Sequence, residues 1–289
     1  MPRHNSTKVS VYKTPDQEWL TLDSRFTFRC HAGLACFNRC CRTATIMLSP
    51  YDLLRLARAL EINTGELLKR YTRREMDAQS NLPLVFIDLS RSPGGGCPFA
   101  GTHGCQVYHS RPAACRLFPI TMGSRLAQNG IEDFYFCRRL DYCQGFDADT
   151  VWTVASWRAN QGFQAYDEAR REWLNLILAQ GLRGPLQVEA AVLDLMATIM
   201  YDLDAFRSLA GATAFRQTCG LADETAAILE QNDAALLDFS CRYLADMLFT
   251  PGKLSGIFEK LADRFVQCIS GAQKKNCAGR PAVDLKTKN

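Results

Sequence analysis

Nine of the thirteen cysteines of this 289-residue chain fall between Cys30 and Cys143, and four of them lie within the run Cys-His-Ala-Gly-Leu-Ala-Cys-Phe-Asn-Arg-Cys-Cys at 30–41. Thiolates are the ligands that zinc and iron–sulfur clusters use in proteins. Disulfides rarely persist in reducing compartments. If the protein is cytoplasmic, this density of cysteines predicts a metal or cluster site rather than a set of disulfides.

The sequence indicates such a compartment. The opening residues 1–8 contain no apolar stretch of signal-peptide length, and the long apolar segment 188–200 is interrupted by Glu189 and Asp194. We therefore expect a cytoplasmic protein without a membrane span. The alternative is a secreted disulfide scaffold, but such scaffolds are usually small, and a chain with 47% hydrophobic residues can build its own core.

The spacing of the cysteines bears on the metal. Only Cys36 and Cys40, with three residues between them, have the close spacing of a zinc knuckle. The other thiols are farther apart, and a cluster of several irons accepts thiolates from more separated loops. We therefore expect an iron–sulfur cluster, of the 4Fe–4S type, and keep zinc or a metal-free redox thiol cluster as alternatives. The candidate ligands are Cys30, Cys36, Cys40, Cys41, Cys97, Cys105, Cys115, Cys137 and Cys143.

Two arginines flank one of these cysteines. Arg111 and Arg116 lie on either side of Cys115, where they could pair with an anionic cluster or donate hydrogen bonds to sulfur. The positive excess of the chain also lies in this half, with 19 Lys and Arg against 14 Asp and Glu in residues 1–150. No basic run with interleaved aromatic residues indicates binding to nucleic acid.

Several neighbouring residues have open roles. Cys40 and Cys41 are adjacent, and successive side chains usually diverge, so either one is a spare thiol or there are two sites. The histidines near the cysteines could ligate directly, although hydrogen bonding to a ligand is the more usual role; these are His31, His103 and His109. The late cysteines are expected to be buried small apolar residues or tail thiols: Cys219, Cys241, Cys268 and Cys277.

The elements that must position these residues can be predicted coarsely. Ser49 as N-cap, Pro50 in the first turn and Asp52 at the capping-box position predict a helix that begins at 50. A second helix is expected from Asn63 or Thr64, and residues 84–89 should form a strand. Residues 97–119 are rich in turn residues and predict irregular backbone with a short extended piece at 106–108.

After Trp152 the pattern becomes helical. Apolar residues recur at helical spacing over 163–180, 185–209, 223–231, 234–248 and 255–269, and residues 272–289 resemble a loose tail. We therefore expect a mainly α protein with a few short strands, in which an irregular, metal-organised N-terminal region packs on a C-terminal helical bundle of about five helices. The expected divisions are an N-terminal segment 1–25, a cysteine-cluster domain 26–150, a helical domain 151–271 and a tail 272–289. The boundary is soft, since Trp152 and Trp157 could dock the halves together.

The cysteines and their flanking residues resemble a known family. The residues that carry this resemblance are the run from Phe28 to Cys41, the segment from Ser49 to Leu56, Gly96-Cys97-Pro98-Phe99, Gly104-Cys105-Gln106-Val107-Tyr108, and Arg111-Pro112 with Cys115, Arg116 and Pro119. Together they are similar to the YkgJ-type cysteine-cluster family, also described as the CxxCxxCC zinc- or iron-chelating domain family. The spacing departs from that name, with gaps of five and three residues before the cysteine pair.

The resemblance implies a metal or iron–sulfur site formed by Cys36, Cys40, Cys41, Cys97, Cys105 and Cys115, with Cys30 as a further member. A similar cysteine pattern occurs in flagellin lysine methylases, which adds an enzyme hypothesis. No nucleotide-binding glycine motif, P-loop, nucleophile elbow or zincin helix is present. Whether the chain is an enzyme stays open. The functional classes are an iron–sulfur or iron protein for redox, sensing or metal handling, a zinc-stapled interaction module that binds a protein partner through its helical half, and a methylase-like enzyme.

Overall fold

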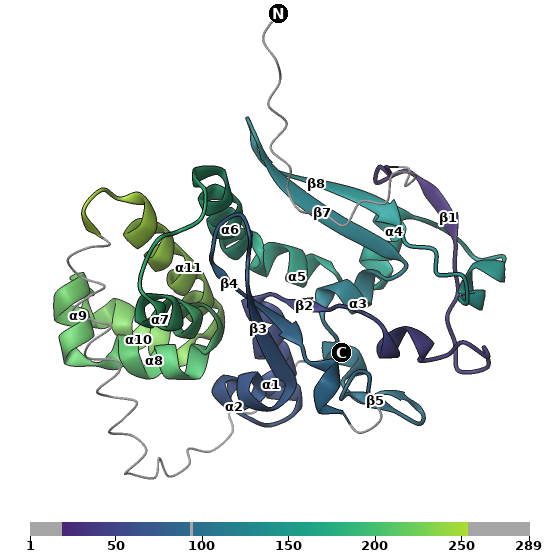
Figure 1. The fold of residues 1–289 in the computed structure, drawn as a ribbon, viewed down its shortest axis with the longest axis horizontal. Helices are drawn as coiled ribbons and strands as arrows, with labels where there is room; N and C mark the ends of the chain where they lie inside the picture. The colour runs from purple at the N-terminus through teal and green to yellow at the C-terminus, as the bar shows by residue number, and fades with distance from the viewer. Residues whose placement is uncertain (1–18, 93–94, 254–289) are drawn as a thin grey trace, which may run out of the picture.

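The computed structural model describes residues 19–92 and 95–253, in which helices and short antiparallel strands alternate (Figure 1). The strands are β1 Arg25–Thr27, β2 Met47–Leu48, β3 Thr72–Met76, β4 Pro83–Ile87, β5 Ala100–Gly101, β6 Gly104–Cys105, β7 Ile120–Ala127, β8 Gly130–Cys137 and β9 Val151–Thr153. The helices are α1 Pro50–Ala59, α2 Thr64–Tyr71, α3 Ala113–Leu117, α4 Val154–Asn160, α5 Gln164–Ala169, α6 Arg171–Arg183, α7 Ala190–Tyr201, α8 Leu203–Gly211, α9 Thr213–Cys219, α10 Asp223–Gln231 and α11 Asp233–Phe249. Short 3₁₀ turns occupy η1 Arg39–Arg42, η2 Leu89–Arg91, η3 Tyr108–Ser110 and η4 Gln144–Asp147.

The first two helices begin where the sequence predicts. Ser49 caps α1 by accepting a hydrogen bond from the Asp52 N–H, while the Asp52 carboxylate accepts from the Ser49 N–H, and Pro50 occupies the first turn. Asn63 caps α2 by accepting from the Glu66 N–H. Both helices satisfy orphan donors at their N-termini with side chains. This confirms the predicted cap at Ser49 and the predicted start of the second helix.

A small sheet follows these helices. Its strand order is β2-β4-β3, and Phe86 of β4 pairs with Met47 on one side and Arg73 on the other. Buried and half-buried residues alternate along β4, which confirms the predicted strand. By contrast, the extended piece expected at 106–108 is wrong: the strand is β6, and Tyr108 begins the turn η3.

The sequence did not predict the β7–β8 hairpin, which lies beside α5 and α6 at the upper edge of the molecule in the view of Figure 1; Asp133 of β8 forms an ion pair with Arg171 of α6. Its register pairs Ile120 with Cys137. The short pair β1–β9 lies beside the hairpin (Figure 1), and the side chains between them form an aromatic cluster. That cluster consists of Phe26, Phe28, Ile120, Tyr135, Val154 and Trp157.

Two predicted long helices are each broken in the structure. The segment 163–180 divides at Arg170 into α5 and α6, and 185–209 divides at Asp202 into α7 and α8. At the second break the Asp202 carboxylate accepts from the Ala205 N–H and from the hydroxyl of Thr64, so it caps α8 instead of continuing α7. This contact joins segments that are 138 residues apart, so the spacing of apolar residues could not predict it.

The later helices follow the sequence more closely. Helices α10 and α11 confirm the predicted segments 223–231 and 234–248, whereas α4 and α9 were not predicted. With α4 to α11 all after residue 150, the estimate of about five helices is too low even within the described part of the chain. The helix expected at 255–269 and the tail 272–289 lie outside the described residues.

One hydrophobic core joins the two halves of the chain. It contains Leu53 and Val85 from the first half together with Leu195, Phe206 and Leu244 from the second, all nearly or fully buried. The expected tryptophan contacts are also present: Trp152 Nε1 donates to the Phe28 carbonyl at 3.0 Å, and Trp157 Nε1 donates to the Leu117 carbonyl at 2.8 Å. The domain division at residue 150 stays a prediction. None of the helices in the described ranges has the length and apolarity to cross a membrane.

A buried tyrosine connects the small sheet to two helices of the bundle. Tyr201 is 1% exposed; its Oη accepts from Trp173 Nε1 at 3.0 Å and donates to the Pro83 carbonyl at 3.1 Å. We predict that Tyr201→Phe lowers the free energy of unfolding by about 1–3 kcal/mol, because two buried polar groups lose their partner. Urea denaturation measures this. The control Tyr142→Phe removes a hydroxyl bonded only at the surface, to Thr43, and should cost less than about 0.5 kcal/mol; equal losses would contradict the prediction.

Candidate metal centre

The cysteine run 30–41 makes two sets of contacts. Its first half lies against the turn η4: the Gln144 N–H donates to Cys36 Sγ at 3.3 Å, and the Gln144 side chain accepts from the Ala35 N–H at 3.1 Å. Just before the run, the Arg29 N–H donates to the Gly145 carbonyl at 2.9 Å. These bonds place Cys30 and Cys36 beside Cys143, the residue before η4.

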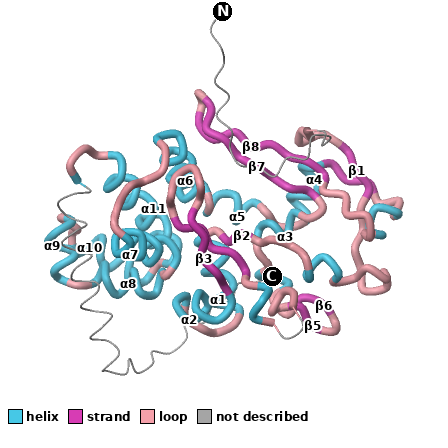
Figure 2. Tube along the Cα trace, in the orientation of Figure 1, coloured by secondary structure: helices cyan, strands magenta, loops and turns pink. Residues whose placement is uncertain are grey.

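The second half of the run lies against the β5–β6 hairpin, which Figure 2 shows at the lower edge of the molecule. Asn38 Nδ2 donates to the Gly101 carbonyl at 3.2 Å, and the Cys97 N–H donates to the Cys41 carbonyl at 2.7 Å. Asn38 has a φ of 62°, in the left-handed region that Asn tolerates better than most residues. The chain therefore turns at Asn38, between its contacts with η4 and those with the hairpin.

The remaining cysteines of this region sit on short elements. Cys105 lies in β6 opposite Ala100, and Gly104 turns the hairpin with a φ of 125°, a conformation that favours glycine. Cys115 lies in the five-residue helix α3. That helix is too short to be stable alone. It is held by Asp52, whose Oδ1 accepts from the Ala113 N–H at 2.8 Å.

Four thiols interact around the hairpin: Cys41, Cys97, Cys105 and Cys115. Burial is the main cause that raises the pKa of Cys115, and the thiols of Cys97 and Cys105 raise it further. Burial likewise raises the pKa of Cys97, with a contribution from Cys105. Cys41 interacts with both Cys97 and Cys115. Neutral thiols are thus favoured here unless a cation compensates the charge.

A second set of thiols interacts around η4: Cys30, Cys36, Cys40 and Cys143. Partial desolvation together with Cys40, Cys143 and Cys36 raises the pKa of Cys30 to about 11. Cys40 differs, because a hydrogen bond with the Cys41 thiol lowers its pKa to about 7, while the pKa of Cys41 is raised. Within this adjacent pair, Cys40 is therefore the thiol that ionises more readily.

None of the eleven cysteines in the described ranges forms a disulfide. Within the same residues, no group of three or more Cys, His, Asp or Glu side chains is arranged closely enough to hold a metal ion as it stands. The structure thus places eight of the nine expected ligands in two neighbouring sets, with Cys137 outside both, and leaves their role as ligands a prediction. Their chemistry fits the group, since soft thiolates are the donors that zinc and iron–sulfur clusters require.

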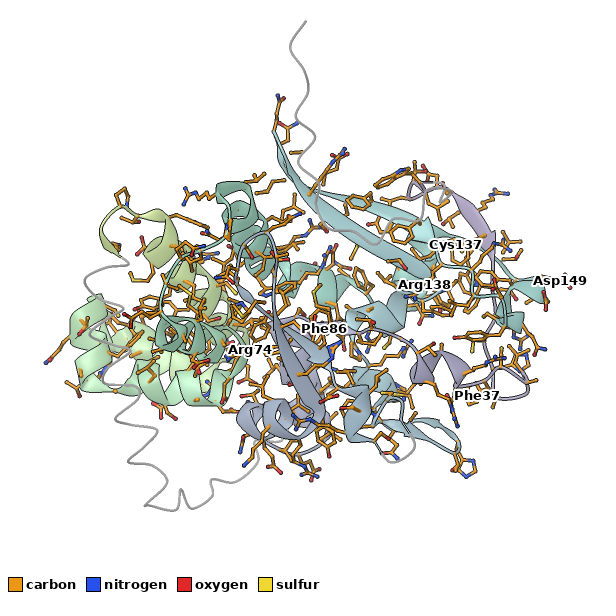
Figure 3. The ribbon with its side chains drawn as sticks, in the orientation of Figure 1. Phe37, Arg74, Phe86, Cys137, Arg138 and Asp149 are labelled. Atoms are coloured by element: carbon orange, nitrogen blue, oxygen red, sulfur yellow. The ribbon has the colours of Figure 1, made fainter. Side chains whose placement is uncertain are left out.

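Cys137 is set apart from the hairpin thiols. It ends β8, away from the β5–β6 hairpin (Figure 3), and interacts with Cys143 and Arg139. Both Cys137 and Cys143 pack against the aromatic cluster.

The two arginines have different surroundings. Arg111 is close enough to Cys105 to favour its thiolate, and it also interacts with Cys115. Arg116 is nearly buried and donates to the backbone carbonyls of Arg111 at 3.1 Å, Gln161 at 2.8 Å and His109. Arg116 therefore fixes the loop around α3. The cluster-binding role expected for both arginines stays a prediction.

The histidines and late cysteines are peripheral. His31 accepts from the Gly33 N–H at 3.2 Å, and it is exposed, as are His103 and His109. Cys241 is 2% exposed within the main core, as expected for a small apolar residue. Cys219 is half-buried and lies 3.5 Å from the Tyr243 hydroxyl. Cys268 and Cys277 lie outside the described residues.

Sequence reasoning missed two positioning residues. Asp52 was recognised only as a helix cap, although it also holds the helix that carries Cys115, and Gln144 was not singled out at all. The role of Asp52 in holding α3 could not be read from the sequence, because the capping pattern with Ser49 already accounts for its carboxylate. The place of Gln144 directly after Cys143 was the available signal for the second.

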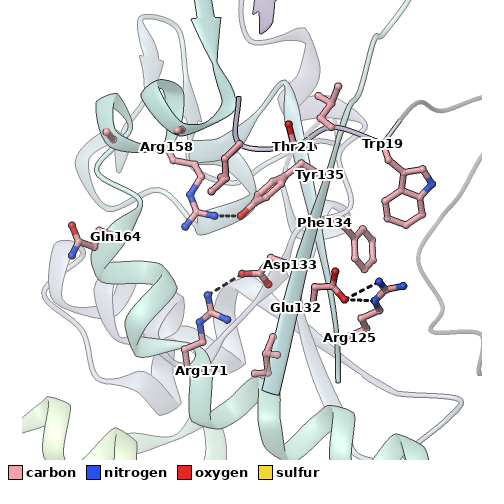
Figure 4. Close-up of a pocket in the computed structure, with 15 residues that line it drawn as sticks. Trp19, Thr21, Arg125, Glu132, Asp133, Phe134, Tyr135, Arg158, Gln164 and Arg171 are labelled. Carbon is pink, nitrogen blue, oxygen red and sulfur yellow. Dashed lines mark hydrogen bonds and ion pairs between the residues drawn. The ribbon is translucent and has the colours of Figure 1, made fainter. Parts of the chain in front are cut away.

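A separate open groove of about 930 Å³ lies between the β7–β8 hairpin and the helices α4 to α6 (Figure 4). Asp133 and Arg171 form an ion pair of 2.9 Å in its wall, and Arg158 donates to the Tyr135 hydroxyl. Behind the wall, burial opposes ionisation of Asp167, but hydrogen bonds and charge from Arg170 and Arg158 outweigh it and lower its pKa. No cysteine lines this groove.

Comparison with known proteins identifies the cysteine-rich region. Residues 29–144 match the CxxCxxCC family. The family is described as "Putative zinc- or iron-chelating domain". The match confirms the expected resemblance and extends it beyond residue 119 to include Cys137 and Cys143. An uncharacterized protein of Methanocaldococcus jannaschii is 32% identical over 109 residues, which cover 37% of this chain and 53% of that protein. The chain thus spans about half the length of this curated relative. No solved structure matches the chain.

We predict that Asp52→Asn loosens the segment that carries Cys115. The amide keeps one acceptor oxygen and cannot serve both Ala113 and Ser49, so a buried N–H loses its partner at a cost of about 1–3 kcal/mol. Chemical denaturation measures the loss, and thiol alkylation with mass spectrometry should show faster modification of Cys115. The control Thr153→Ala breaks a similar capping box on the exposed end of α4. It should leave Cys115 reactivity unchanged; a rise in both variants would contradict the assignment.

Proposed function

We propose that this protein binds iron as an iron–sulfur cluster through the cysteines of residues 30–143 and uses it in redox chemistry, sensing or metal handling. The family match supports metal binding by a zinc- or iron-chelating domain. The observation that carries the proposal is that thiols from three separate segments lie near one another, and that Cys30, Cys41 and Cys115 have their pKa raised by burial and by neighbouring thiols. Such thiols need a cation to ionise together.

Two features favour a cluster over a single zinc ion. The thiols come from loops and very short elements rather than from close pairs, and a multi-iron cluster accepts ligands from separated loops. At Cys36 a backbone N–H donates to sulfur, which is one way in which proteins tune clusters. Arg111 beside Cys105 adds positive charge, which would offset part of the negative charge of a thiolate-bound cluster.

Metal analysis after purification without oxygen tests the proposal. We expect a brown protein that absorbs broadly near roughly 400 nm and contains iron and acid-labile sulfide. A colourless protein with stoichiometric zinc would instead support a zinc-stapled interaction module. A protein that contains neither metal, and takes up neither when reconstituted, would end the proposal for both.

Substitution of individual thiols tests the ligand assignment. We expect Cys97→Ser and Cys115→Ser to lose metal and to destabilise the cysteine-rich half, because the binding free energy of such a site is also folding free energy. The control Cys241→Ser lies in the core of the helical half and should cost about 1–2 kcal/mol while metal content stays unchanged. Full metal content in the first two variants would show that these thiols are not ligands.

A further inference from the structure

The geometry of the run 30–41 points to a division of the cysteines. Before Asn38, the run contacts η4 through Cys36 and Ala35; from Asn38 onward, it contacts the β5–β6 hairpin. The backbone bond between Cys41 and Cys97 belongs to the hairpin side. The run therefore connects two separate loops, and each loop carries cysteines of its own.

The two loops rest on different hydrophobic clusters. Cys97 and Cys105 pack against the main core, which also contains α1 and the helical bundle. Cys143 packs instead against the aromatic cluster between the β7–β8 hairpin and β1. Each loop is therefore supported by packing of its own, and the run 30–41 joins the two.

We propose that the chain holds two metal centres, not one. The first is formed by Cys41, Cys97, Cys105 and Cys115, and the second by Cys30, Cys36, Cys40 and Cys143. The inference rests on the proposed metal-binding function and adds a second site to it. Each group supplies four thiolates, the number that both zinc and 4Fe–4S clusters require.

The adjacent pair Cys40-Cys41 is where the groups divide. Their thiols are hydrogen-bonded to each other, but Cys40 also lies near Cys30 and Cys143, while Cys41 lies near Cys97 and Cys115. The neighbours of each thiol agree with this division: Cys30 lies near Cys36, Cys40 and Cys143, whereas Cys115 lies near Cys97 and Cys105. Cys40 also interacts with Cys97 and Cys115, so the two centres would be close neighbours. Cys137 remains outside both groups.

Metal content of single and double variants tests the division. Cys30→Ser removes an exposed thiol of the second group and should not disturb the fold. We expect it to lower the iron or zinc per chain to about half of the native value, and Cys105→Ser to do the same. The double variant should lose all metal. The half-buried Cys219 lies outside both groups, so Cys219→Ser is the matched control and should keep native content.

Alkylation of the metal-loaded proteins gives a second, residue-resolved measurement. In Cys30→Ser, we expect Cys36, Cys40 and Cys143 to become reactive while the four thiols of the first group stay protected. If Cys105→Ser unfolds, its thiols all become reactive and that variant says nothing about the division. The result for Cys30→Ser then decides the question, because the side chain it replaces is exposed.

Three results would overturn the division. These are complete metal loss in both single variants, unchanged metal in Cys30→Ser, or loss of protection in both groups when only Cys30 is replaced. Each of them leaves the proposed metal binding intact as a single centre. A native chain without any metal would instead defeat the proposed function together with this inference.

Discussion

Thiols that lie within reach of one another cannot all carry negative charge in a half-buried environment. Burial and the neighbouring sulfurs act in the same direction at Cys30, Cys97 and Cys115, and each group holds its proton more tightly as a result. A compensating cation reverses this preference. In the cysteine-rich half, short elements and loops place the thiols near one another. The same loops supply backbone N–H groups that can donate to sulfur, as Gln144 does to Cys36.

The cysteine-bearing segments are held in place by residues from other parts of the chain. Asp52 at the start of α1 holds the short helix with Cys115, and Gln144 holds Cys36 through its backbone N–H. Arg116 ties the same short helix to the end of α4 through the Gln161 carbonyl. The positions of the sulfurs are therefore set by residues that belong to both halves of the chain, and metal binding should be sensitive to the packing between them.

Sequence patterns were informative where the cause of structure is local. The caps at Ser49 and Asn63 and the buried alternation of β4 depend on residues a few positions apart, so they could be predicted. The break at Asp202 could not, because its cause is the Thr64 hydroxyl 138 residues away. The β7–β8 hairpin was missed although it is local, because the turn signal of Asn129-Gly130 where its strands meet was not used. At the site, the identity of the thiols could be read from the sequence, whereas their grouping required the contacts of the run with two loops.

The helical half contacts the segment that carries Cys115. Trp157 in α4 donates to the Leu117 carbonyl at the end of α3, and the Tyr166 ring lies beneath the Arg116 guanidinium. Both contacts join the segment that carries Cys115 to α4 and α5. Helix α4 also borders the open groove beside the β7–β8 hairpin, so one helix contacts both that groove and the segment that carries Cys115.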